Sequence, residues 1–476
     1  MMNKRTNYDW TGEHLLLGRR DGKPWFSGSV DTSGWLGYGS WTDRSVSVWA
    51  RLMSPEWEGE GMTQDFIVSA DGHILEPSDL FTTRLPKHLR DRAVWEEDFE
   101  IEPLVEGGVR HFRRLHTPGF EGWTISRYRQ SDGPAPTGDP DRILDDMTED
   151  GVAASLMHPN LSLFGLYSDD HELSMAHARV YNDYLIERFL PYSARIRPTC
   201  PVPITDIDDA VAEIERIAQA GLGAILLPAI PPKPYYSREF DRVWEAAQAN
   251  HTHVFFHCAT GGVKVDDPES TTMKTVARMS QKVNQPMTEK IASDRMVEQA
   301  IMGPIVPQQI MAQLIGGGVP ERFPDLHFGL IEFNAHWLVS LIGSMDKAWV
   351  TGIGQDPDWW LGYWDSDRPA TTDDQPAMAR LFRLNDRWPY PLKPSEYVHR
   401  QFHVSFQDDP TAVAARNITG LSTIIWGNDY PHAEGTFRHS QELIADQFAG
   451  VPDDERAPIL GGTLGEILGF KAPVSV

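Results

Sequence analysis

The sequence is poor in cysteine and in positive charge. Its 476 residues include only Cys200 and Cys258, too few for a disulfide framework or a cysteine-rich zinc site, so we expect a reducing cytoplasm. Lys and Arg total 43 against 68 Asp and Glu, which gives a formal net charge of −25. This acidic balance argues against partners that are bound through nucleic-acid phosphates or anionic membranes.

Several sequence signals are also missing. No run of 18 apolar residues is present, so no transmembrane helix is expected, and the opening MMNKRTNYDW has no apolar stretch typical of a secretory signal. No GxGxxG or Walker A loop follows a strand-like run, which weakens the case for a nucleotide-binding sheet. The GxSxG elbow of serine hydrolases is absent as well.

Residues 1–61 differ in composition from the rest of the chain. They hold six of the 16 tryptophans and show neither helical nor strand periodicity. We expect an N-terminal extension outside the domain at 62–476. Two interpretations stay open: translation starts at Met62, or the segment is an arm whose tryptophans pack on the domain or on a neighbouring subunit.

After Met62, apolar strand-like runs alternate with helix-like segments. The helices are expected at residues 174–190, 206–220 and 238–250, and the eight runs lie at residues 66–71, 153–159, 197–203, 223–229, 253–258, 327–333, 402–407 and 423–429. This alternation predicts a (β/α)₈ TIM barrel, with an open doubly wound sheet as the alternative. Long loop insertions are expected at residues 259–300 and 351–395, where lids, binding loops or interface arms are usual.

Histidines and carboxylates stand at the ends of the predicted strands, the edge where barrel active sites form. Asp71 and His73 end the first strand two residues apart, so alternation places both on one face. His257 ends the fifth strand and Asp429 the eighth. Two imidazoles and two carboxylates suit one Zn²⁺ or Mn²⁺ ion. The alternative is that these residues are unrelated turn and core residues.

The motifs at these strand ends also carry a resemblance. The stretches IVSADGHILEPSDLF, HVFFH and IIWGNDYPHAEGTFRHS, with others in the same order over about residues 65–472, resemble amidohydrolase-related metal-dependent hydrolases. That group also contains aminocarboxymuconate-semialdehyde decarboxylase. The resemblance implies metal ligands at Asp71, His73, His257 and Asp429. It also implies that Asp429 handles the proton of the metal-bound water, and that the site holds one ion.

The sixth strand departs from the family pattern. Relatives commonly have a histidine at its end, where this chain has Glu332. Glu332 is expected to act either as a proton donor or base, or as a structural acid that holds a ligand histidine. His158, His336 and His432 are candidates for lining the substrate pocket. Cys258 follows His257, so its side chain is expected to point away from the pocket.

These expectations lead to a metal-dependent enzyme acting on a small, possibly ring-bearing molecule. The first interpretation is hydrolysis of an amide, ester or lactone by metal-activated water. The alternative is non-oxidative decarboxylation of an aromatic or enoic acid at the same site. A catalytically silent binding scaffold is a third. The tryptophan-rich segments favour a homo-oligomer.

Overall fold

The structure, a computed structural model, describes most of the chain after residue 64. The described residues are 65–101, 110–116, 123–125, 138–166, 170–261, 303–354, 388–432 and 434–471. The expected extension at residues 1–61 and most of the two expected loop insertions lie outside them.

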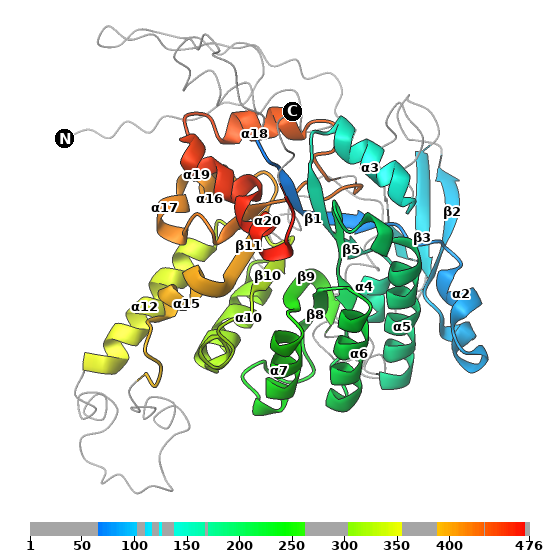
Figure 1. The fold of residues 1–476 in the computed structure, drawn as a ribbon, viewed down its shortest axis with the longest axis horizontal. Coiled ribbons are helices and arrows are strands. Elements are labelled where there is room, and N and C mark those ends of the chain that lie inside the picture. Colours follow the sequence, from blue (N-terminus) through cyan, green and yellow to red (C-terminus); the bar gives the residue numbers. More distant parts are fainter. Residues whose placement is uncertain are drawn as a thin grey trace, which may run out of the picture. The chain divides into compact units, whose positions relative to one another are not determined.

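Parallel strands form the centre of the fold (Figure 1). Along the chain they are β1 (Val68–Ile74), β5 (Ala154–Pro159), β6 (Ile196–Pro198), β7 (Cys200–Pro201), β8 (Ala224–Ile230), β9 (His253–Gly261), β10 (Phe328–Ile331), β11 (Phe402–Phe406) and β12 (Ile424–Trp426). Because β6 and β7 are one strand interrupted at Thr199, the described residues contain the eight strands expected from the sequence.

Neighbouring strands pair in chain order, from β1 to β5 to β6 and from β7 through β8, β9, β10 and β11 to β12. Two contacts complete the ring. The Thr199 N–H donates to the Met157 carbonyl at 2.9 Å, and the Asp429 N–H donates to the Asp71 carbonyl at 2.7 Å. A bridge between Gly72 and Tyr430 lies beside the second contact. The predicted (β/α)₈ barrel is confirmed.

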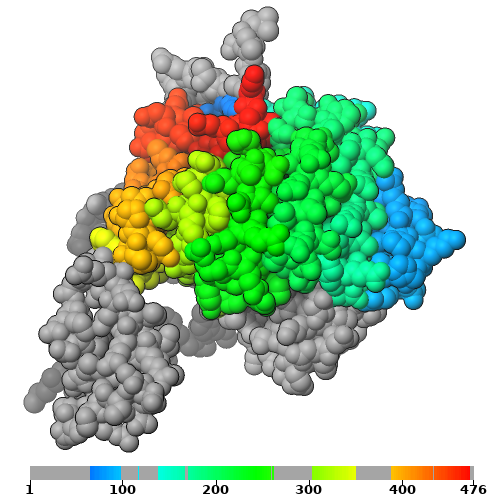
Figure 2. Space-filling model, turned by 60° about the horizontal axis from the view of Figure 1, so that its bottom comes forward, coloured from blue at the N-terminus to red at the C-terminus, as the bar shows by residue number. Residues whose placement is uncertain are grey.

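Helices cover the outside of the strands (Figure 1). The three helices expected from periodicity are α5 (His171–Arg188), α6 (Ile207–Gln219) and α7 (Asp241–Ala249). Asp170 and Asp206 cap the first two, accepting from Leu173 N and Asp209 N, as short acidic side chains do at helix starts. In the space-filling view the colours follow chain order across the surface, so successive βα units adjoin (Figure 2).

The remaining α-helices lie in the connections between strands, except for the last three, which follow β12. They are α2 (Leu80–Arg84), α3 (Pro140–Glu149), α4 (Ser162–Gly165), α10 (Ile305–Gly316), α11 (Val319–Arg322), α12 (Leu338–Gly354), α15 (Pro394–Gln401), α16 (Pro410–Ala414), α17 (Arg416–Thr419), α18 (Ser440–Gln447), α19 (Asp453–Ala457) and α20 (Thr463–Leu468). A small antiparallel sheet of β2 (Trp95–Ile101), β3 (Arg110–His116) and β4 (Trp123–Ile125) lies in the connection between β1 and β5. Within the described part of the chain, no helix is long and apolar enough to cross a bilayer.

Alternation along the strands separates two apolar clusters. Ala224 and Leu226 belong to a cluster inside the barrel, whereas Ile225 and Leu227 pack among residues of the surrounding helices. The same alternation puts Phe255 in the inner cluster and therefore His257, two residues later, on the inner face. The His257 side chain therefore points into the interior of the barrel.

Candidate metal centre

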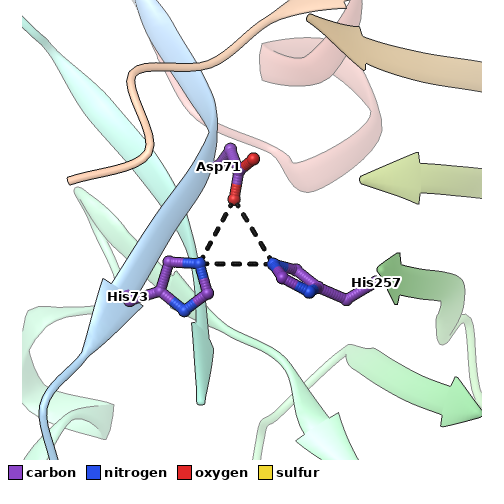
Figure 3. A group of neighbouring side chains, drawn as sticks. All are labelled: Asp71, His73 and His257. Atoms are coloured by element: carbon purple, nitrogen blue, oxygen red, sulfur yellow. Dashed lines mark hydrogen bonds and ion pairs between the residues drawn. The ribbon is translucent and has the colours of Figure 1, made fainter. Parts of the chain in front are cut away.

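Three predicted ligands meet at the carboxyl ends of β1 and β9. The Nε2 atoms of His73 and His257 are 3.2 Å apart, and Asp71 Oδ1 lies 3.6 and 3.7 Å from them (Figure 3). All three side chains are buried. Asp429, the fourth predicted ligand, follows β12 and places Oδ1 3.4 Å from His73 Nε2. The structure therefore brings the four predicted ligands to one place.

A bulge in β1 directs Asp71 and His73 inward. Val68 and Ala70 face the inner cluster, and the pairing of β1 with β5 shifts register between Ser69 and Gly72. A bulge of this kind reverses the phase of the strand and can re-aim side chains. Asp71 and His73 can therefore follow Ala70 into the interior, on the shared face that their spacing predicts.

Two glycines permit the close approach of β1 to its neighbours. A Cβ atom at Gly72 would lie 2.6 Å from Met157 Sδ, and one at Gly427 would lie 2.6 Å from the Cβ of Asp71. Asp429 itself has a left-handed backbone with φ of 52°, a conformation that non-glycine residues seldom adopt. Such backbone strain tends to persist where function requires a particular side-chain position.

Backbone carbonyls orient both ligand histidines. His73 Nδ1 lies 3.0 Å from the Pro159 carbonyl, and His257 Nδ1 lies 3.0 Å from the Cys258 carbonyl. A carbonyl only accepts, so each Nδ1 carries the proton. The Nε2 atoms of the neutral rings are then left as electron-pair donors that face one another. Histidines that bind metals are commonly held in this way.

The buried carboxylate oxygens fit a cation. Asp71 Oδ1 and both side-chain oxygens of Asp429 are buried, and no donor among the described residues meets them with good hydrogen-bond geometry, although imidazole nitrogens lie close to both Oδ1 atoms. Leaving such atoms unsatisfied costs free energy that a bound metal ion would recover. Two imidazole nitrogens and two carboxylates form a donor set that suits a divalent ion.

The electrostatics of the four groups are tightly linked. Burial disfavours the charged form of Asp71, but the imidazoles of His257 and His73, 3.7 and 3.6 Å from Oδ1, hold the pKa of that carboxyl well below its usual range. Burial raises the pKa of Asp429 to about 6; the His73 imidazole, 3.4 Å from Oδ1, opposes this increase and the charge of Asp71 adds to it. Against the effect of burial, Asp429 and Asp71 raise the pKa of His73. Asp429 thus titrates close to neutral pH, as a group that exchanges protons requires.

Glu332 lies at the edge of this group, at the end of β10. Its Oε2 is 3.3 Å from His257 Nε2, and its backbone is left-handed with φ of 61°. Burial, together with the charge of Asp429, raises the pKa of the Glu332 carboxyl. The strand-six position singled out in the sequence is therefore in contact with a predicted ligand.

The expected orientation of Cys258 was wrong. Its Sγ donates to Glu332 Oε2 at 2.8 Å, so the thiol lies beside the site instead of pointing away from it. Strand alternation fails here because the pairing of β8 with β9 shifts register between Pro228 and Ile230. Burial raises the pKa of the Cys258 thiol well above its usual range, which leaves it protonated and a poor nucleophile.

His158 and His432 lie on two sides of His73. His158 is fully buried, with Nδ1 3.1 Å from Thr199 Oγ1 and Nε2 3.1 Å from the Ala70 carbonyl. Burial, then the charge of His257, holds the pKa of His158 well below its usual range, so the ring is neutral. His432 stacks on the His73 ring with centroids 4.0 Å apart and places Nδ1 2.9 Å from Asp429 Oδ1.

His336 is held elsewhere. Its Nδ1 lies 3.0 Å from Asp409 Oδ2, which also accepts from the backbone N–H groups of Ala335 and His336. The side chain is 44% exposed. Glu434, which the sequence analysis did not consider, lies near Glu332, Asp429 and His432. Its position two residues after the DYPH motif is the sequence signal that could have placed Glu434 near the site.

Comparison with known proteins identifies the family of the chain. A family model described as amidohydrolase matches residues 111–470, which is most of the chain. The chain belongs to the amidohydrolase family. Members of the family are enzymes, hydrolases or decarboxylases, so the resemblance read from the sequence motifs is confirmed. No curated protein is significantly similar to the chain in sequence.

Solved structures share the fold of this amidohydrolase. An amidohydrolase from Mycobacterium avium subsp. paratuberculosis K-10 matches with a TM-score of 0.58 at 18% identity, covering 86% of this chain and 99% of that one. IDCase from Metarhizium anisopliae matches with a TM-score of 0.51 at 14% identity, covering 85% and 97%. The 2,6-dihydroxybenzoate decarboxylase from Rhizobium gives 0.49 at 14% identity, covering 85% and 99%. At these identities the likeness concerns the fold alone.

Proposed function

We propose that this amidohydrolase hydrolyses an amide, ester or lactone of a small, ring-bearing or apolar molecule, using water activated by one divalent ion, Zn²⁺ or Mn²⁺. The observation that carries the proposal is the convergence of His73 and His257 on two buried carboxylates, three of whose oxygens have no well-aligned hydrogen-bond donor among the described residues. Asp71, His73, His257 and Asp429 would hold the ion. Bound there, a divalent ion lowers the pKa of its water from about 15.7 to about 7 and so provides hydroxide at neutral pH.

Asp429 is the proposed proton carrier. In the metal-free site, burial raises the pKa of Asp429 to about 6, so the surroundings of this carboxylate favour uptake of a proton, as a carrier between water and a leaving group requires. The left-handed backbone at Asp429 fixes the carboxylate beside His73, while the Asp429 N–H is held by the Asp71 carbonyl. Asp71 remains ionised throughout, because its pKa lies far below neutrality.

The histidines around the four ligands keep them in place. His73 and His257 are fixed through Nδ1, which leaves Nε2 to bind the ion once that nitrogen has given up its proton. Both ring nitrogens of His158 contact protein groups, so we assign this residue a structural role on the buried side of the site. His432 lies above the His73 ring, and we assign it to the wall that a substrate meets. His336 remains a candidate at the mouth, through its exposed face.

A second candidate function is non-oxidative decarboxylation of an aromatic or enoic acid. Glu332 favours it, because a carboxyl whose pKa is raised by burial can retain a proton and donate it to carbon as CO₂ leaves. The carboxyl lies 3.3 Å from His257 Nε2, at the edge of the same site. Hydrolysis ranks first because it requires only Asp429 as the proton carrier.

Metal analysis followed by a paired substrate screen tests the proposal. Purified protein is assayed for divalent ions, then offered esters, lactones and amides in one arm and hydroxybenzoates and enoic acids in the other. Acid release in the first arm alone supports hydrolysis, whereas CO₂ release in the second alone replaces it with decarboxylation. Protein that binds no divalent ion would overturn both.

A further inference from the structure

The residue before Asp429 belongs to a buried polar network outside the ring of strands. Asn428 follows β12, and its Oδ1 accepts from the Ser69 hydroxyl at 2.9 Å and from the Tyr430 N–H at 3.3 Å. Its Nδ2 donates to Asp150 Oδ2 at 3.1 Å. Because the Tyr430 N–H only donates and a carboxylate only accepts, these partners determine which end of the amide faces which.

Ser69 extends the network to the strand that carries Asp71. Its hydroxyl oxygen accepts from the Asn428 N–H at 3.1 Å and from the Asp71 N–H at 3.3 Å. The hydroxyl has one proton to donate, and the Asp71 carbonyl, also 2.9 Å away, already accepts from the Asp429 N–H. We therefore assign the hydroxyl proton to Asn428 Oδ1. Ser69 also stands where the register of β1 shifts, so this pair ties the bulge to the segment after β12.

Asp150, the residue that ends α3, anchors the other side of the Asn428 amide. Its buried carboxylate accepts at Oδ1 from the backbone N–H groups of Arg438 at 2.8 Å and Ser440 at 3.4 Å. Oδ2 accepts from the Ser440 hydroxyl at 2.5 Å as well as from Asn428. A carboxylate held at both oxygens has little freedom to turn, so the Asn428 amide meets a fixed acceptor.

The network acts on the backbone of both predicted carboxylate ligands. Asp429 lies between two residues, Asn428 and Tyr430, that the Asn428 side chain ties together, and its own backbone is left-handed with φ of 52°. A backbone of this kind persists only where the surrounding structure holds it in place. Asp71 is tied to the same amide through Ser69.

We propose that Asn428 is a positioning residue for the metal centre, and that its side chain, held between Asp150 and Ser69, sets the backbone from which Asp71 and Asp429 reach the ion. The proposal rests on the proposed function in that it takes these two carboxylates as ligands. Partners of this kind, which do not touch the ion themselves, commonly contribute about 10–100-fold to metal affinity.

Metal binding to stripped protein tests the role without any substrate. In Asn428→Ala we expect the affinity for Zn²⁺ to fall by about 10–100-fold, because both carboxylates lose their support. The visible absorption of bound Co²⁺, which depends on the geometry of its ligands, should change as well. Ser69→Ala removes one hydroxyl and should weaken binding in the same direction. Combining the two changes should cost less affinity than the sum of their separate effects, because both act through one network.

Asn182→Ala is the matched control. Asn182 is also buried, and its amide donates to the buried Glu213 carboxylate at 2.7 Å, between α5 and α6. It should lower the melting temperature as Asn428→Ala does, yet keep the Zn²⁺ affinity and the Co²⁺ spectrum of the parent protein.

Two results would overturn the proposal. The first is an Asn428→Ala protein that is less stable but keeps the Zn²⁺ affinity and Co²⁺ spectrum of the parent, since the network would then serve the fold alone. If Asn428→Ala does not fold, the same result in Ser69→Ala decides against the role. The second is a parent protein that binds no divalent ion, which contradicts the proposed function and this role with it.

Discussion

The Nε2 atoms of His73 and His257 face one another at 3.2 Å, although 184 residues separate them in the chain. The Nδ1 atom of each ring contacts a backbone carbonyl, and this contact fixes the orientation of the ring. The two Nε2 atoms are therefore held in this position. The pair forms the nitrogen half of the proposed metal site. A change in either ring should therefore act first on metal content.

His257→Ala should remove the tightly bound ion. The variant keeps three ligands but loses one of the two imidazoles, so we expect its affinity for the ion to fall far enough for dialysis to remove the ion. Metal content after dialysis measures the effect. His336→Ala is the control, because that ring pairs with Asp409 away from the ligands and its loss should leave the ion in place. Full metal occupancy in His257→Ala would contradict the ligand assignment.

Asp429→Asn should abolish turnover under either chemistry. The amide can occupy the same position but cannot accept a proton, and loss of one general base typically costs about 10²–10⁴-fold in rate. Turnover of the best substrate from the screen measures it, with metal content determined in parallel. A turnover rate within about tenfold of that of the parent protein would mean that another group carries the proton. The pH–rate profile of the variant would then report that group, with Glu332 the first to examine.

The barrel and the metal ligands were predictable because their signals are local. Each strand is a short apolar run, and each of the ligands Asp71, His73, His257 and Asp429 stands at the end of one. The contacts of Cys258 and Glu434 depend on strand register and on the path of the chain after β12. The bulge at Ser69 and Gly72 is set by pairing with β5, which one strand's sequence does not encode.

Glu332→Gln should separate the two enzymatic functions. If Glu332 donates a proton to carbon, the variant stops CO₂ release and keeps the metal ion. If Glu332 instead supports His257, metal affinity should fall by about 10–100-fold, the usual cost of losing a partner that orients a ligand. Measuring both quantities on one preparation decides between these roles. A variant unchanged in both would exclude Glu332 from the reaction and from support of the ion.

The stabilisation that a metal ion gives should grow as the pH rises from 5 to 7.5. In protein stripped of metal, the pKa of Asp429 is raised to about 6, above its ordinary value of 3.8. A carboxyl of this kind favours the folded state below its unfolded pKa and loses that contribution as the pH rises through 6. The raised pKa values of His73 and His257 act in the same direction.

Melting temperatures of metal-loaded and metal-stripped protein, compared at each pH, measure this effect. Metal binding requires ionised carboxylates and neutral imidazoles, so the ion competes with protons for the same atoms. Groups outside the site, whose titration the ion leaves unaltered, cancel in the difference. A difference that stays constant or shrinks between pH 5 and 7.5 would show that these groups do not bind the ion.

Gly72→Ala should destabilise the barrel and disturb the ligands on both sides of it. The added Cβ would lie 2.6 Å from Met157 Sδ and 2.9 Å from Ser155 Oγ, so these side chains or the bulge itself must move. Overpacking of this kind typically costs about 1–3 kcal/mol of unfolding free energy. Gly343→Ala on α12 is the control, because nothing lies within 4 Å of its added Cβ. Alanine there should be neutral or stabilise the helix by up to about 1 kcal/mol.

Chemical unfolding and metal content together report the result. Equal stability and equal metal content in the two variants would mean that the close packing at Gly72 does not position Asp71 and His73.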